Sequence, residues 1–173
     1  MRRVPLRAFL SMMHPSFTKT KKLAFSAMVA AAYIAVMYVT QGFAFGPYQM
    51  RVATALYALA YLFPFLVVPL ALANSLSNLL MGGLGFFDIV GGFLVGIVTA
   101  GIAALIRKWE LPMWPVILPI ALGPGLIVPL WLSGLTGIPY WTLVGLITPP
   151  QAACGVVGYL FINALSRRKV EHL

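Results

Sequence analysis

The sequence predicts an all-α integral membrane protein, a bundle of six transmembrane helices whose N- and C-termini both lie in the cytoplasm. Three observations support this fold class. Of the 173 residues, 61% are hydrophobic and only 9% are charged, and a water-soluble domain of this length could not bury that much apolar surface. The chain also contains long runs without any charged residue, and its basic residues gather at three places.

Four long runs of the chain contain no Asp, Glu, Lys or Arg. One crossing needs about 20 apolar residues, so the first and third runs each predict one helix, and the second and fourth each predict two. The runs lack the strict alternation of barrel strands, and helices satisfy their own backbone hydrogen bonds in lipid. The runs are residues 23–50, 52–87, 89–106 and 111–166.

The basic clusters predict the orientation, because Lys and Arg hold the flanks of membrane helices on the cytoplasmic side. Four crossings before the middle cluster and two after it place all three clusters inside. We therefore expect a basic cytoplasmic segment (residues 1–22), a transmembrane domain (23–166) and a basic tail (167–173). The net charge of +9 comes from these clusters, and we expect them to face anionic lipid headgroups rather than nucleic acid. The clusters are Arg2, Arg3, Arg7, Lys19, Lys21 and Lys22; Arg107 and Lys108; and Arg167, Arg168 and Lys169.

The first four helices are bounded by Gly and Pro. The first is expected over residues 23–40, followed outside the cell by a loop or re-entrant segment (41–50) that contains Gly42, Gly46 and Pro47. Pro64 separates the second helix from the third because the residue before a proline is disfavoured in a helix. A glycine-rich external turn (81–85) precedes the fourth. The second, third and fourth helices are expected over 51–63, 65–80 and 86–106.

Prolines disturb the last two predicted helices. Five of them fall within the fifth crossing, and each interior proline removes a backbone hydrogen bond, so this helix should be kinked or broken. An external turn (133–139) precedes the sixth helix (140–165), which Pro149 and Pro150 should bend. The five are Pro112, Pro115, Pro119, Pro124 and Pro129.

Two charges, Arg51 and Asp88, lie away from the cytoplasmic clusters, at the predicted outer ends of the second and fourth helices. A charge in the membrane region is costly and marks a pathway or binding site. Further polar side chains, Tyr48, Gln49, Asn74 and Asn78, are predicted in the same outer half, which favours a polar cavity open to the outside. The alternative is a pair of interfacial charges in contact with headgroups, with Asp88 at a helix N-terminus.

Other polar and aromatic residues allow two interpretations. Asn74 and Asn78, four residues apart, share one helix face and either bind a ligand or join helices by hydrogen bonds. Trp131, Tyr140 and Trp141 either form an aromatic belt at the membrane interface or stack on a planar ligand.

Two helices carry strips of small residues that let another helix approach closely. One strip is Ala27, Ala31 and Ala35, and the other is Gly92, Gly96, Ala100 and Ala104. Packing within the bundle explains at least one of them, and the other can serve a partner protein.

Enzyme chemistry is not expected. Both histidines, His14 and His172, lie in the predicted tails, Asp88 is the only acid in a predicted membrane segment, and no catalytic or nucleotide-binding motif occurs. With Cys154 as the single cysteine, the sequence predicts no disulfide, no metal site and no cofactor.

Several segments resemble the queuosine-precursor transporters, the QueT family. FGPYQMR at residues 45–51, followed by Ala55 and Leu56, resembles its G-P-x-Q-x-R-x-x-E-A-L segment, and NLLMGGLGFFDIV at 78–90 resembles its N-L-x-G-G-L-G-x-x-D-I-V segment. GIPYW at 137–141 and CGVVG at 154–158 also match. The resemblance covers roughly residues 22–165.

The resemblance implies a substrate-binding S component of an energy-coupling factor (ECF) transporter. Such a component captures a small vitamin-like molecule, here a deazaguanine queuosine precursor, outside a prokaryotic cell. A transmembrane T component and two cytoplasmic ATPases then drive its release inside. In such components an A-x-x-x-A face on the first helix contacts the T component, and Ala27, Ala31 and Ala35 match that face.

The chain departs from the family at two acidic positions. Thr54 stands where the family has glutamate, and Pro149, Pro150 or Gln151 lies near the place of a second glutamate in the last helix. These departures leave open an S component for another vitamin or heterocycle. A scaffold subunit without a ligand and a self-sufficient secondary carrier are the other hypotheses, the last disfavoured by the lack of buried charges for ion coupling. In the S-component hypothesis, residues 41–50 form a lid over the site.

Overall fold

The computed structural model describes residues 17–45, 49–81 and 85–171, with side chains to residue 167. Over these ranges the chain forms helices and turns and no strand, which confirms the all-α class. Four helical spans in these ranges are long and apolar enough to cross a membrane: Lys19–Ala44, Phe86–Lys108, Trp114–Thr136 and Tyr140–Arg167. The protein is therefore a multi-pass membrane protein, and the count of six crossings with cytoplasmic termini stays a prediction.

The predicted second and third helices are two shorter apolar segments, Val52–Leu62 and Pro64–Leu80. The first begins as a 3₁₀ helix, η1 (Val52–Ala58), and ends as a single α-helical turn, α3 (Leu59–Leu62). Phe63 is extended, with φ −133° and ψ 81°, as expected for a residue before proline. The second comprises η2 (Pro64–Leu66) and α4 (Val67–Leu80).

Proline also divides the fifth segment, as predicted. It consists of η3 (Trp114–Val116), α6 (Ile117–Ile127) and α7 (Pro129–Thr136). Pro129 occupies the first turn of α7, where it lacks the N–H that would have continued α6. Gly137 ends α7 with φ 71°, a conformation that glycine adopts without strain. The expected turn at 133–139 is therefore shorter, because α7 continues to Thr136.

The prediction of a loop or re-entrant segment at residues 41–50 is partly wrong. Helix α2 (Lys19–Ala44) begins before residue 23 and continues past residue 40 to Ala44, because Gln41 and Gly42 are tolerated near a helix end without a proline to stop them. Residues 46–48 lie outside the described residues. Helices α5 (Phe86–Lys108) and α8 (Tyr140–Glu171) follow the predicted fourth and sixth helices, and each extends beyond its predicted end.

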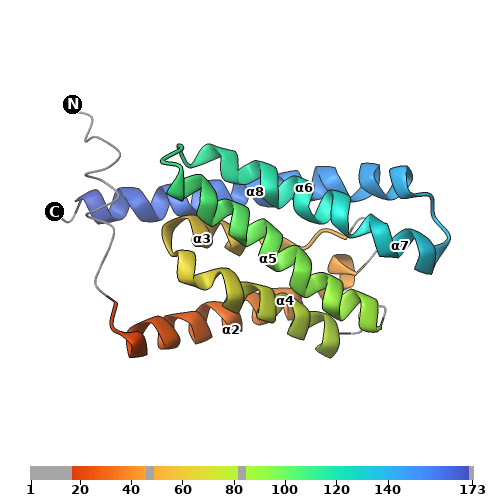
Figure 1. The fold of residues 1–173 in the computed structure, drawn as a ribbon, viewed down its shortest axis with the longest axis horizontal. Helices are drawn as coiled ribbons and strands as arrows, with labels where there is room; N and C mark the ends of the chain where they lie inside the picture. Colours follow the sequence, from red (N-terminus) through yellow and green to blue (C-terminus); the bar gives the residue numbers. More distant parts are fainter. Residues whose placement is uncertain (1–16, 46–48, 82–84, 172–173) are drawn as a thin grey trace.

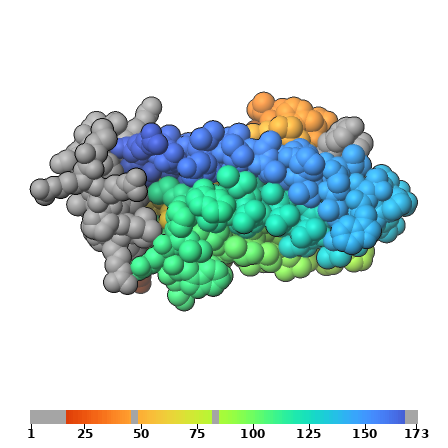
Figure 2. All heavy atoms as spheres, turned by 90° about the horizontal axis from the view of Figure 1, so that it is seen from above, coloured from red at the N-terminus to blue at the C-terminus, as the bar shows by residue number. Residues whose placement is uncertain are grey.

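The helices run side by side along the long axis of the molecule, with the start of α2 and the end of α8 at the same end (Figure 1). Helix α4 packs along α5, α6 packs along α8, and α2 packs on α4 and η1. Figure 2 shows α8 extending along one face beside α6. Helix α2 is the most peripheral long helix, since only four of its 26 residues are buried, against ten of the 23 residues of α5.

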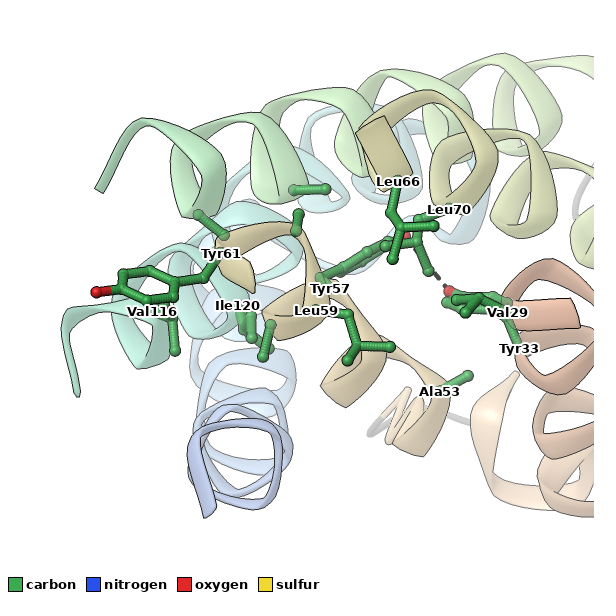
Figure 3. Close-up of a cluster of buried hydrophobic side chains, with 14 of the residues drawn as sticks. Val29, Tyr33, Ala53, Tyr57, Leu59, Tyr61, Leu66, Leu70, Val116 and Ile120 are labelled. Atoms are coloured by element: carbon green, nitrogen blue, oxygen red, sulfur yellow. Dashed lines mark hydrogen bonds between the residues drawn. The ribbon is translucent and has the colours of Figure 1, made fainter. Parts of the chain in front are cut away.

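The core surrounds the broken η1–α3 segment. Figure 3 shows Tyr33 of α2 and Tyr57 of η1 pointing toward each other, and their hydroxyl oxygens are 3.3 Å apart. At the opposite end of the segment, Arg107 Nη1 donates to the carbonyls of Tyr61 and Leu62. The break at Pro64 deprives these carbonyls of helical partners, so Arg107 satisfies them and anchors α5 to α3.

Candidate functional site

A polar pocket lies where the start of η1, the last turns of α4 and the first turns of α5 meet α6, α7 and α8. Six of the predicted ligand-binding residues line it: Gln49, Arg51, Asn74, Asn78, Asp88 and Trp131. The other lining residues are Thr54, Gly92, Val95, Pro124, Val128 and Gln151. Residues far apart in sequence therefore form one buried polar cluster inside an apolar bundle.

Arg51, immediately before η1, is the centre of the cluster and is only 5% exposed. Its Nη1 donates to Oδ1 of Asn78 at 2.9 Å and to Oδ1 of Asn74 at 3.2 Å. The two amides are fixed in turn, since Asn74 Nδ2 donates to the Gly92 carbonyl and Asn78 Nδ2 to the Asp88 carbonyl. The pair on α4 thus joins two helices and also orients the guanidinium.

Asp88 supplies the negative charge of the pocket from the first turn of α5, where a carboxylate is favoured by the helix dipole. It is 2% exposed. Its Oδ2 lies 3.8 Å from Arg51 Nη2, and its Oδ1 accepts a hydrogen bond from Trp131 Nε1 at 3.3 Å. On another side of Arg51, the Phe45 ring centroid lies 5.1 Å from Cζ, a cation–π distance.

The remaining polar side of the pocket is neutral. The Thr54 hydroxyl lies 2.8 Å from Gln151 Oε1 and 2.7 Å from the Arg51 carbonyl, two acceptors for its single proton. Gln151 Nε2 donates to the carbonyl of Gln49 at 2.9 Å. Gln49 has a φ of 39°, which is uncommon for a residue with a side chain, and this hydrogen bond helps to hold it.

Two glycines of α5 let the pocket close tightly. A Cβ on Gly92 would lie 2.5 Å from Asn78 Nδ2, and one on Gly91 would lie 2.6 Å from the Trp131 ring. The free space between the lining residues is about 10 Å³, which is room for roughly one water molecule. A ligand the size of a heterocyclic base therefore requires the lining to move apart.

Two other predicted ligand-binding residues, Tyr140 and Trp141, are not among the described residues that line the pocket. Tyr140 donates from its hydroxyl to the Leu126 carbonyl and packs edge-on against Trp141, which is 76% exposed. Both positions suit the aromatic belt that was the alternative interpretation. Tyr48 lies outside the described residues.

Sequence reasoning left Phe45, Thr54 and Gln151 out of the predicted site. Thr54 follows Arg51 by three residues in a 3₁₀ turn, so both project toward the same side, and this spacing was a usable signal. Gln151 lies in the middle of an apolar helix, where a lone buried amide also indicates a polar partner. Only its pairing with Thr54, 97 residues away, needed the three-dimensional structure.

The small-residue strip of α2 faces away from the bundle. Ala27, Ala31 and Ala35 are exposed, whereas Val29, Tyr33 and Met37 on the other side of the helix are buried. Ala31 and Ala35 line an open groove with residues from the end of α4, Leu80 and Met81. The exposed strip can receive another helix.

These arrangements suit binding rather than bond-making. The pocket offers hydrogen-bond donors, acceptors and one ion pair. Within the described residues no group of three or more His, Cys, Asp or Glu comes together in a way that could hold a metal ion.

A protein-family model described as QueT transporter matches residues 23–167 of the chain. The match includes every residue that lines the pocket and all of α5, α6 and α7. No curated protein and no solved structure matches the chain.

Proposed function

The chain belongs to the QueT transporter family, and we propose that it is the substrate-binding S component of an ECF transporter, capturing a small heterocycle outside the cell. The observation that carries this proposal is the Arg51-centred polar cluster buried at one end of an apolar bundle. Burying a guanidinium and a carboxylate costs several kcal/mol per ion before pairing. A ligand-binding role gives a reason for that cost.

The substrate class that the family suggests is a deazaguanine queuosine precursor. The lining of the pocket favours a ligand with a planar polar ring. Its amides, hydroxyl and guanidinium supply directional hydrogen bonds, and Trp131 supplies a flat apolar surface. Gln151 offers an amide, which can pair with an adjacent carbonyl and N–H of such a ring.

The exposed strip of α2 is the proposed contact with a transmembrane T component. Two cytoplasmic ATPases would complete the transporter and hydrolyse ATP, because the chain contains no nucleotide-binding motif. The proposed location is the plasma membrane of a prokaryotic cell. There the basic clusters face the cytoplasm and its anionic lipids, and the pocket faces outward.

Calorimetric titration of the purified protein tests the binding role. The panel comprises deazaguanine bases, guanine and common vitamins. We expect saturable binding to a deazaguanine, and we expect Arg51→Ala or Asp88→Asn to weaken it at least tenfold, about 1.4 kcal/mol. Trp114→Phe, at an exposed position outside the pocket, is the control and should leave affinity unchanged. Binding of another vitamin would keep the role and change the substrate.

Co-purification tests the partners. The tagged protein should retain a T component and two ATPases from its native membrane. Folded protein that binds no compound of the panel but retains membrane partners would support the scaffold hypothesis instead.

A further inference from the structure

The Arg51 guanidinium is satisfied along one side only. Nη1 donates to Asn74 and Asn78, whereas Nε and Nη2 are buried and have no hydrogen-bond partner among the described residues. Asp88 Oδ2, 3.8 Å from Nη2, attracts this side but lies beyond hydrogen-bond distance. A buried donor without an acceptor costs roughly 1–3 kcal/mol, and more when it is charged. Within the part of the chain that the structure describes, these charged donors are thus left unsatisfied.

These two nitrogens are on the same edge of the guanidinium. Nε–H and one Nη2–H point in parallel, and this edge binds two acceptors that lie side by side, such as the two oxygens of a carboxylate. It binds the O6 and N7 atoms of guanine in the same way. The hydrogen bonds of Nη1 to two amides and the contact of Cζ with the Phe45 ring fix the orientation of the edge.

The charges around the pocket disfavour a cationic ligand. Arg51 and Asp88 are the only ionisable groups among its described lining residues. Asp88 already interacts with Arg51 and Trp131. Thr54, which stands where the family has glutamate, and Gln151, which lies near the place of the second family glutamate, form a neutral hydrogen-bonded pair. A ligand ammonium group would therefore face the guanidinium without a carboxylate of its own.

We propose that this pocket selects a planar ligand that presents two hydrogen-bond acceptors side by side to the Nε/Nη2 edge of Arg51, and that it discriminates against ligands with a cationic substituent there. The inference rests on the proposed function, whose pocket it uses. A purine-6-one ring, through its carbonyl and neighbouring ring nitrogen, and a heterocyclic carboxylate share this chemistry.

A ring-matched ligand series tests the proposal on the full-length wild-type protein by calorimetry. Guanine and 7-deazaguanine differ in one ring atom: guanine has the acceptor nitrogen N7, where 7-deazaguanine has a carbon. On that carbon, 7-carboxy-7-deazaguanine carries an anionic group and 7-aminomethyl-7-deazaguanine a cationic group. We expect guanine or the carboxylate to bind at least tenfold more tightly than 7-deazaguanine, and the aminomethyl compound to bind weakest. If guanine binds more tightly than the carboxylate, the ring carbonyl and ring nitrogen supply the two acceptors. If the carboxylate binds more tightly, its two oxygens supply them.

Arg51→Lys provides the matched variant. Lysine keeps the positive charge but has no two-donor edge, so the preference over 7-deazaguanine should fall below about threefold. Trp114→Phe, at an exposed position outside the pocket, should preserve the wild-type order. The wild-type series decides the question even if Arg51→Lys does not fold.

The outcomes separate the two proposals. Three outcomes would overturn the inference and leave the S-component role intact. The aminomethyl compound could bind most tightly, or guanine, the carboxylate and 7-deazaguanine could bind equally. Folded Arg51→Lys could also keep the wild-type preference over 7-deazaguanine. Absence of binding across the whole series and the vitamin panel, by protein shown to be folded, would overturn the proposed function and this inference with it.

Discussion

Small residues recur every fourth position on both α5 and α2, but the two strips lie in opposite surroundings. On α5, Gly92, Gly96 and Ala100 are buried against α4 and η1. On α2, Ala27, Ala31 and Ala35 are exposed. The same sequence pattern therefore closes the bundle in one helix and remains available to a partner in the other.

The residues on the remaining faces of each helix explain the difference. Helix α2 packs on the bundle through large side chains, Val29, Tyr33 and Met37, so its alanines are not needed there. Helix α5 instead exposes Leu94, Val98 and Ile102, which are suited to lipid, and turns its small residues inward. A small-residue strip indicates close helix packing, and the position of the large residues indicates whether that packing is within the chain.

The largest effect is expected from filling the buried strip at Gly96. A Cβ at this position would lie 2.6 Å from the Ala71 Cα and 3.3 Å from the Tyr57 hydroxyl. Since backbone cannot move aside as a flexible side chain can, Gly96→Leu should separate α4 from α5, at a cost above the usual 1–3 kcal/mol of overpacking. Size-exclusion profiles and thermal unfolding in detergent should show aggregated or strongly destabilised protein. A monodisperse variant of normal stability would contradict the close contact.

The exposed strip should respond in the opposite way. Ala31→Trp adds bulk where the bundle does not pack, so the isolated protein should keep its stability and its ligand affinity. The proposed contact with the T component should weaken at least tenfold, measured as the loss of T component and ATPases on co-purification. Leu94→Trp, at an exposed position of α5, is the matched control and should retain them. Equal loss in both variants would remove the special role of α2.

Much of this comparison could be predicted from the sequence, but not all of it. Charge-free runs and prolines predicted the helices and their breaks, because hydrophobic length and missing N–H groups act locally. Arg51, Asp88, Asn74 and Asn78 could be assigned to one site because charges and amides are costly in lipid.

The orientation of each strip and the pairing of Thr54 with Gln151 depend on contacts between distant segments. A single sequence does not contain that information in local form. Helix α2 continues to Ala44 because glutamine favours a helix and a single glycine weakens it without ending it, so Gln41 and Gly42 mark no boundary.

A smaller effect is expected at Gly92, where the buried strip meets the pocket. A Cβ there would lie 2.5 Å from Asn78 Nδ2, which now donates to the Asp88 carbonyl. The amide can shift, so Gly92→Ala should leave the fold intact but turn Asn78 away from Arg51. We expect ligand affinity to fall about threefold to tenfold, up to about 1.4 kcal/mol, by calorimetry. Unchanged affinity would mean that Asn78 does not orient Arg51 for binding.

The smallest effect, with the opposite sign, is expected at Gly101 on the same helix. A Cβ on Gly101 meets no atom within 4 Å, so alanine fits without displacing a neighbour. Replacing glycine in a helix restricts the unfolded chain and stabilises the folded one by about 0.4–1 kcal/mol. The melting temperature of Gly101→Ala should therefore rise by roughly 1–4 °C, while Gly96→Leu lowers it. If Gly101→Ala were as destabilising as Gly96→Leu, α5 would require glycine for its backbone conformation. Close packing against α4 would then no longer distinguish the buried strip from the exposed one.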